Sequence, residues 1–192
     1  YEVAYAGEKS EHKLGPAETN TKQAQGLFVV LPPKMVTSQI AEAYSGEYFY
    51  YSGSGNELDN FMVKEFDLAA GSTLNAWVNF DIEEDWDYAY LVVSTDNGAT
   101  WEGVETNFST TLDPNAQNFG FGITGNSGGW AELEADLSAY TGSVLLGFRY
   151  WTDPYVANTG FMVDDIVITG YPLDDAESDT GWTHTGFTRT TG

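Results

Sequence analysis

Apolar and polar residues alternate along short stretches of this chain, and Gly, Asn, Asp and Ser separate the stretches. Alternation with a period of two is typical of β-strands that bury one face. The pattern predicts strands at residues 27–31, 47–52, 60–68, 73–80, 87–94, 101–104, 130–136, 144–151 and 160–169. No segment keeps a 3.6-residue apolar period, so we expect no amphipathic helix.

Many short, evenly spaced strands with Gly-rich turns favour an all-β fold, and we expect a jelly-roll β-sandwich at residues 27–170. Residues 1–26 are polar and read as a linker or edge segment. Residues 171–192 read as an acidic linker followed by the start of another module. The long polar stretch 106–129 predicts a loop with a structural or functional purpose. The chain begins at Tyr1 without an initiator Met, so we expect a piece of a longer protein.

The composition supports a folded, non-membrane domain. Apolar residues make up 42% of the 192 positions and aromatic residues 15%, which is enough to build a packed core. The absence of cysteine excludes disulfides, thiol catalysis and thiolate metal sites. No apolar run approaches the roughly 18 residues of a membrane span.

The charge is strongly negative and unevenly distributed. The formal net charge is −22, and residues 65–192 contain only Arg149 and Arg189 as basic side chains. Nucleic acids and membrane insertion are therefore poor expectations, because anionic phosphates require a basic surface. Two compatible interpretations of the acidity remain: a solubilising surface, and carboxylates that bind Ca²⁺.

One acidic stretch, residues 81–87, is a candidate calcium site. If the backbone is extended, four carboxylates share one face: Asp81, Glu83, Asp85 and Asp87. That face continues into apolar positions at 89–93, so the charges need a partner. A calcium ion, backbone N–H groups or Arg149 would serve. The alternative is a solvated loop in which only Asp87 is buried.

The predicted strand 161–168 is apolar on both faces, yet it contains Asp164 and Asp165. At least one of these two side chains should therefore be buried. A buried carboxylate must be paired or bound to a metal. The alternatives are calcium and a salt bridge to Arg149.

Residues Ser94–Trp101 fit the Asp-box pattern S-x-D-x-G-x-T-W. The pattern predicts a hairpin in which Asp96 accepts hydrogen bonds from its own turn, Gly98 takes a positive φ and Trp101 packs beneath. We therefore interpret Asp96 as a structural residue.

The chain shows no catalytic motif. The two histidines, His12 and His184, lie near opposite ends, and neither H-E-x-x-H nor G-x-S-x-G occurs. The abundant aromatic residues permit a sugar-stacking face, with Trp86 and Trp151 as candidates. The alternative for these rings is packing in the core and at its rim.

Several blocks of the chain, in their order and spacing, resemble the domain that follows the catalytic domain in peptidases of the immune inhibitor A type, the M6 peptidases. The blocks are Leu31-Pro32-Pro33-Lys34, Tyr51–Asp59, Asp81–Tyr90 followed by the Asp-box, Gly122–Trp130, Asp136–Gly142, Phe148–Asp153, Gly160–Ile166, Gly181-Trp182 and Gly186-Phe187. The resemblance runs from about Leu27 to Phe187.

The resemblance implies a secreted bacterial zinc metallopeptidase as parent, with its Zn²⁺ bound in a catalytic domain upstream of Tyr1. It also implies a jelly roll similar to MAM and carbohydrate-binding modules, in which an Asp near the last strand binds structural calcium. That role would fall on Asp164 or Asp165, and further on Glu83, Asp85 and Asp87. Asn56 stands where the family often has an acid.

From these observations we expect a non-catalytic, calcium-stabilised accessory domain. It would pack on its own catalytic domain or help to hold a protein or glycan substrate. The alternatives are a free-standing carbohydrate-binding module, with Trp86 and Trp151 stacking on sugar, and an adhesin-type structural domain.

Overall fold

A computed structural model describes residues 39–192, which form one compact unit. Its regular elements are β-strands joined by turns and loops. The strands are β1 (Phe49–Tyr51), β2 (Asp59–Leu68), β3 (Thr73–Ile82), β4 (Tyr88–Ser94), β5 (Glu102–Val104), β6 (Gly125–Asn126), β7 (Ala131–Asp136), β8 (Gly142–Trp151), β9 (Gly160–Ile168), β10 (Thr183–Thr185) and β11 (Thr188–Thr190).

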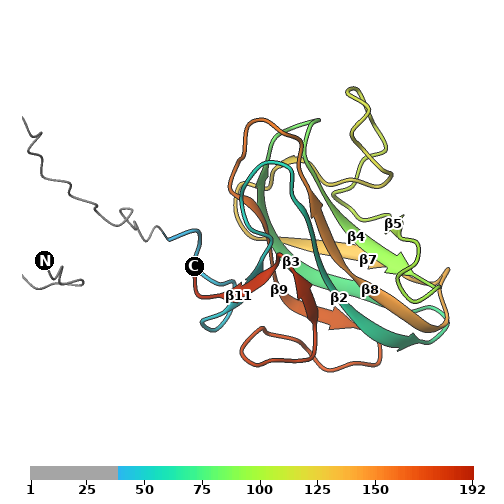
Figure 1. The fold of residues 1–192 in the computed structure, drawn as a ribbon. Coiled ribbons are helices and arrows are strands. Elements are labelled where there is room, and N and C mark those ends of the chain that lie inside the picture. Colours follow the sequence, from blue (N-terminus) through green and yellow to red (C-terminus); the bar gives the residue numbers. More distant parts are fainter. Residues whose placement is uncertain (1–38) are drawn as a thin grey trace, which may run out of the picture. The chain divides into compact units, whose positions relative to one another are not determined.

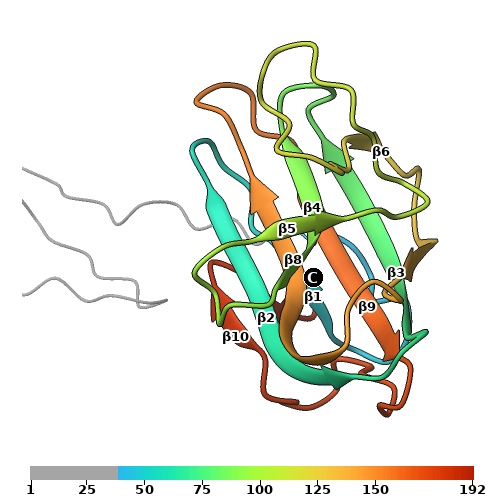
Figure 2. The ribbon, with the colours of Figure 1, turned by 90° about the vertical axis from the view of Figure 1, so that its right-hand side faces the viewer.

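The strands form two antiparallel sheets that face each other (Figures 1 and 2). One sheet has the order β11-β1-β9-β3-β6, with β7 also paired to β3, and the other has the order β10-β2-β8-β4-β5. Chain neighbours β2 and β3 lie in different sheets, as do β3 and β4. The chain therefore crosses repeatedly between the layers, and the all-β sandwich prediction is confirmed.

The core lies between the two sheets and follows from the alternation along the strands. In β3, buried positions alternate with partly exposed ones from Leu74 to Ile82. In β2 and β8, Met62 and Phe148 point inward and are fully buried. The inward residues of both sheets, including Leu91 of β4 and Val163 of β9, make one continuous hydrophobic cluster.

Strand β4 departs from simple alternation, because all seven of its residues are buried. Ala89, Leu91 and Val93 belong to the core cluster, whereas Tyr88 and Tyr90 lie in a second cluster on the opposite face. Part of the 106–124 loop covers that outer face: Phe119 N–H donates to the Tyr90 hydroxyl at 3.1 Å. The predicted long loop thus has a structural purpose.

The predicted strands between residues 47 and 169 are confirmed within a few residues of their ends. The strand predicted at 27–31 lies outside the described residues. The structure differs from the prediction at 171–192, which was assigned to a linker and a further module. Strand β10 pairs with β2, and β11 pairs with β1, so this segment completes both sheets.

The acidic composition of residues 171–181 suggests a solvent-exposed linker, but one of its acids, Asp174, is buried. Asp174 is buried and accepts hydrogen bonds from the Tyr50 hydroxyl at 3.1 Å and from Trp182 Nε1 at 2.7 Å. Its backbone also forms a bridge with Ile166 of β9. The segment is therefore anchored to the sandwich. Residues 39–192 include no helix long and apolar enough to cross a membrane.

Candidate metal site

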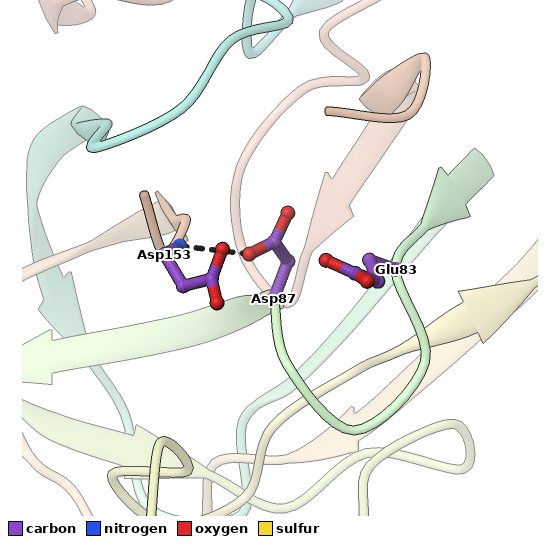
Figure 3. A group of neighbouring side chains, drawn as sticks. All are labelled: Glu83, Asp87 and Asp153. Atoms are coloured by element: carbon purple, nitrogen blue, oxygen red, sulfur yellow. Dashed lines mark hydrogen bonds between the residues drawn. The ribbon is translucent and has the colours of Figure 1, made fainter. Parts of the chain in front are cut away.

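Three carboxylates meet at one end of the sandwich. Glu83 follows β3, Asp87 precedes β4, and Asp153 lies two residues beyond the end of β8. Each contributes an oxygen, and these oxygens all lie within 4.8 Å of one another (Figure 3). The group therefore joins the end of a strand from one sheet to strand ends of the other.

A tight turn between β3 and β4 brings Glu83 and Asp87 together. The backbone N–H of Asp87 donates to the Glu83 carbonyl at 3.1 Å, and Asp85 takes a positive φ of 66°. Thr124 fixes the turn, since its hydroxyl accepts from the Asp85 N–H at 3.1 Å and donates to the Glu83 carbonyl at 3.1 Å. Of the two alternatives for residues 81–87, the extended one does not form: β3 ends at Ile82, residues 83–87 turn, and Asp85 is not part of the three-carboxylate group.

The third carboxylate is fixed by the loop after β8. The Asp153 N–H donates to Asp87 Oδ1 at 2.8 Å, and Asp153 Oδ1 accepts from the Tyr155 N–H at 2.7 Å. The Asp153 carbonyl accepts from the Glu57 N–H at 2.8 Å, and Asn56 Nδ2 donates to the Pro154 carbonyl at 3.1 Å. The loop containing Asn56 thus supports the Asp153 loop.

Burial leaves two carboxylate oxygens without a partner. Asp87 is fully buried and Asp153 is 4% exposed. Within the described residues, three buried atoms here make no hydrogen bond: Glu83 Oε2, Asp87 Oδ2 and the hydroxyl of Tyr150, which lies close enough to Asp87 to feel its charge. Buried charges in proteins are normally paired or bound to a metal, so this group has the chemistry of a cation site.

The pKa shifts of these carboxylates also favour a cation site. Burial raises the pKa of Asp87 to about 6, helped by the charges of Asp153 and Glu83 and opposed by the N–H of Asp153. Burial also raises the pKa of Glu83, with a further contribution from Asp153. Asp153 thus disfavours the ionised forms of Asp87 and Glu83, and a divalent cation would remove that repulsion.

Asp164 and Asp165 lie elsewhere, in the middle of β9. Asp164 is fully buried, and its Oδ2 accepts from the N–H groups of Tyr44 at 3.0 Å and Ser45 at 3.2 Å. Its Oδ1 accepts from the N–H of Asp165 at 2.8 Å. Asp165 has a positive φ of 45° and accepts from the Ser45 hydroxyl at 2.8 Å. The expectation of one buried carboxylate in this strand is confirmed, and its partners are backbone N–H groups.

Arg149 pairs with neither of these two carboxylates. Its Nε and Nη2 donate to Asp59 Oδ1 at 2.7 Å and Oδ2 at 3.0 Å. The salt bridge considered between Arg149 and Asp164 or Asp165 is therefore wrong. The reason is topological, because β8 and β9 belong to different sheets and Arg149 points away from the core between them.

The Asp-box forms the turn that its sequence predicts. Asp96 Oδ1 accepts from the Thr100 N–H at 2.9 Å, and Oδ2 accepts from the Thr100 hydroxyl at 2.7 Å. Gly98 has a φ of +87°. The Thr100 hydroxyl and N–H lower the pKa of Asp96 to about 2. Asp96 thus stabilises its own turn.

The sequence analysis does not single out Asp153, which the structure places in the three-carboxylate group. Strand pairing brings Asp153 to the group, because Trp151, two residues before it, lies opposite Tyr88 across β8 and β4. Of the two candidate stacking residues, Trp86 is 40% exposed on the turn beside Asp87, and Trp151 is half-buried on β8.

Comparison with known proteins places the chain in a family. The family model for the immune inhibitor A-like MAM domain matches residues 10–192. Pre-pro-metalloprotease PrtV, from two strains of Vibrio cholerae serotype O1, is 34% identical over 181 residues, which cover 91% of this chain and 19% of the relative. Bacillopeptidase F of Bacillus subtilis is 27% identical over 95 residues, which cover 49% of this chain and 5% of the relative. The chain thus spans about a fifth of the Vibrio relatives, and it belongs to the immune inhibitor A-like MAM domain family.

Proposed function

We propose that this chain is a non-catalytic, calcium-stabilised accessory domain of a secreted zinc metallopeptidase. The observation that carries the calcium site is the pair of buried oxygens, Glu83 Oε2 and Asp87 Oδ2, that have no hydrogen-bond partner among residues 39–192. Together with Asp153 they offer oxygen ligands alone, which suits a hard cation such as Ca²⁺.

The position of the group suggests what the ion does. Glu83 ends a strand of one sheet, whereas Asp87 and Asp153 flank strands of the other. A bound ion would link the two sheets at this end of the core. The chain has no cysteine, so no disulfide can make such a link. Ligand binding to the native state alone stabilises a fold by mass action.

Support for the parent protein comes from the relatives. The Vibrio relatives are described as pre-pro-metalloproteases, and this chain corresponds to 19% of their length. In our proposal, Zn²⁺ belongs to a catalytic domain outside this chain. The present domain packs on that catalytic domain or helps to hold a protein or glycan substrate. A secreted bacterial location follows from the same parentage.

The lack of a zinc centre in the sequence supports a non-catalytic role. A catalytic zinc site needs three converging protein ligands, commonly His with Glu or Cys. This chain has two histidines, His12 and His184, far apart in sequence, and no cysteine. We expect the pure chain with added Zn²⁺ to leave casein intact. Zinc-dependent cleavage that survives repurification of the chain would contradict this assignment.

Thermal melting tests the calcium site. The chain should melt several degrees higher in millimolar Ca²⁺ than in chelator, because a ligand at 100 times its Kd adds about 2.7 kcal/mol. Asp87→Asn should lose this response. Asp85→Asn is the matched control, since Asp85 lies in the same turn but outside the group, and Asn tolerates its positive φ. An equal calcium response in parent and Asp87→Asn would reject the site.

A further inference from the structure

The face of the five-stranded sheet that points away from the core carries its own aromatic cluster. Tyr88, Tyr90 and Val92 are buried there, and four other side chains are half-buried around them: Phe61, Val63, Trp101 and Trp151. The strands that carry most of them, β2, β8 and β4, lie in the interior of the sheet (Figure 2). The central strand β8 is paired on both sides, with β2 and β4, so a ligand on this face would bind mainly side chains.

Strand register arranges these side chains in two rows. Phe61, Arg149 and Tyr90 lie opposite one another across β2, β8 and β4. The neighbouring row, two residues along each strand, consists of Asp59, Trp151 and Tyr88. Alternation places both rows on the same face. Polar and aromatic groups are thereby interleaved on one surface.

Arg149 is the centre of this surface. Its guanidinium carbon lies over the rings of Phe61 and Phe119, 5.1 Å from each ring centre. Two of its N–H groups bind Asp59. The Arg149 side chain is 20% exposed and that of Asp59 is 52% exposed, so both partners keep hydrogen-bonding capacity toward solvent. The charges of the pair cancel.

Two further rings border the pair. Phe119, on the 106–124 loop, is 56% exposed, and its ring centre lies 5.1 Å from that of Trp151 at an interplanar angle of 72°. Trp101, at the end of the Asp-box, packs against Phe61 at 5.4 Å. Backbone anchoring of Phe119 to the Tyr90 hydroxyl holds the exposed ring in place. The 106–124 loop therefore positions an aromatic side chain at an open surface.

We infer that this face, defined by Phe61, Arg149, Asp59, Phe119 and Trp151, binds a neutral glycan. Sugar rings present apolar C–H faces that pack on aromatic rings. Sugar hydroxyls both donate and accept, which matches a guanidinium beside a carboxylate. The inference is independent of the calcium proposal.

Other ligand classes fit this face less well. The cancelled charge of the Arg149–Asp59 pair gives no excess attraction for a phosphate or carboxylate. The net charge of −22 disfavours nucleic acid and anionic lipid. An extended peptide would add at a strand edge, whereas the proposed face is the broad side of the sheet.

The test is a glycan array that contains neutral, sialylated and sulfated oligosaccharides, followed by titration of the best neutral oligosaccharide with the full chain. Four variants are compared with the parent: Phe119→Ala, Arg149→Lys, Tyr155→Ala and Trp86→Ala. Phe119→Ala and Arg149→Lys alter the proposed face. Tyr155, which is 72% exposed, and Trp86, which is 40% exposed, are aromatic controls on other loops.

Saturable binding to neutral glycans should weaken about tenfold or more in Phe119→Ala, the scale of losing an aromatic anchor. Arg149→Lys should weaken it too, because Lys keeps the charge but loses the planar fork. Both controls should bind as the parent does. Phe119 is exposed, so its variant should fold, and near-ultraviolet circular dichroism checks this. No binding on the array, binding confined to sulfated glycans, or loss only in Trp86→Ala would overturn the inference.

Discussion

Two acidic groups in this domain look alike in sequence and differ in structure. At Asp164–Asp165, the fully buried carboxylate accepts three backbone N–H groups, from Tyr44, Ser45 and Asp165. At Glu83–Asp87–Asp153, two buried oxygens accept no hydrogen bond from the part of the chain that the structure describes. Backbone donors satisfy the first group, whereas two oxygens of the second have no donor among residues 39–192.

The difference shows that the number of acids is a weak guide to a metal site. What distinguishes the two groups is the supply of donors around each carboxylate. The segment 42–48 lies against β9 and offers N–H groups to Asp164, with Tyr44 stacked on Trp77 at 3.9 Å. At the other group, Asp87 lies beside two carboxylates and accepts a single hydrogen bond from the described residues, from the Asp153 N–H. Burial without donors is the signature of a cation site.

The largest effect should come from the satisfied group. Asp164→Ala removes the acceptor of three N–H groups, and we expect a loss of about 3 kcal/mol in the free energy of unfolding, since each unpaired donor costs about 1–3 kcal/mol before relaxation. The loss should be the same with Ca²⁺ and with chelator. Urea denaturation under both conditions measures it.

Asp165→Asn is the control for that variant, because Asn tolerates the positive φ and still accepts from the Ser45 hydroxyl. It should unfold close to the parent. A calcium-dependent loss in Asp164→Ala would instead show that Asp164 binds the ion and would remove the contrast between the two groups.

The second effect is expected at Glu83–Asp87–Asp153. There, the effect of Asp87→Asn on the free energy of unfolding should differ between Ca²⁺ and chelator. In Ca²⁺ at about 100 times its Kd, Asp87→Asn should cost up to about 2.7 kcal/mol, the stabilisation supplied by the ion. In chelator the same variant should be neutral or stabilising, since it removes a buried charge while an amide oxygen can still accept from Asp153 N–H. Melting curves of parent and variant under both conditions check this. Equal destabilisation under both conditions would mean that no ion acts there.

A smaller effect is expected at the rim of the same group. Glu83 is only partly buried, so Glu83→Gln should weaken calcium binding about tenfold, or roughly 1.4 kcal/mol, without abolishing it. Calorimetric titration with Ca²⁺ measures the Kd directly. A variant that binds as tightly as the parent would leave Glu83 outside the coordination sphere.

The smallest effect extends the comparison to an exposed acid. Hydrogen bonds from Thr100 lower the pKa of Asp96 to about 2, below the ordinary value near 4. Its contribution to stability is therefore present above about pH 4 and lost as the pH falls through about 2. Asp96→Asn should lie below the parent in urea midpoint at pH 7 and converge with it near pH 2. A gap that stays constant with pH would show that ionisation of Asp96 is irrelevant.

The alternation of apolar and polar residues was enough to predict most of the strands. The alternating pattern identified β2, β3 and β8 because each buries one face, and the two-sided apolar pattern of β9 correctly implied a buried Asp. The C-terminal segment was misassigned because composition cannot reveal that Asp174 is internal. The local sequence pattern indicates which residues of a strand are buried. The position of a segment such as 171–192 depends instead on residues that are distant in sequence.

The candidate site was only partly visible for the same reason. Glu83 and Asp87 stood out as clustered acids, but their closeness depends on a turn fixed by Thr124, which is distant in sequence. Asp153 is also remote in sequence and reaches the group through strand pairing between β4 and β8. No short-range pattern encodes either contact. The unpaired oxygens, which decide the chemistry, become evident in three dimensions alone.

The pairing of the last strands has a consequence for how the domain is made. Phe49 pairs with Thr190, and Met62 pairs with His184, so the earliest and latest described strands are partners. During synthesis, β1 and β2 emerge from the ribosome well before the segments that cover their edges. Contacts so distant in sequence form slowly, and an uncovered strand invites pairing with another chain. The edges of β1 and β2 therefore stay uncovered in a nascent chain until residues 183–190 close the sandwich.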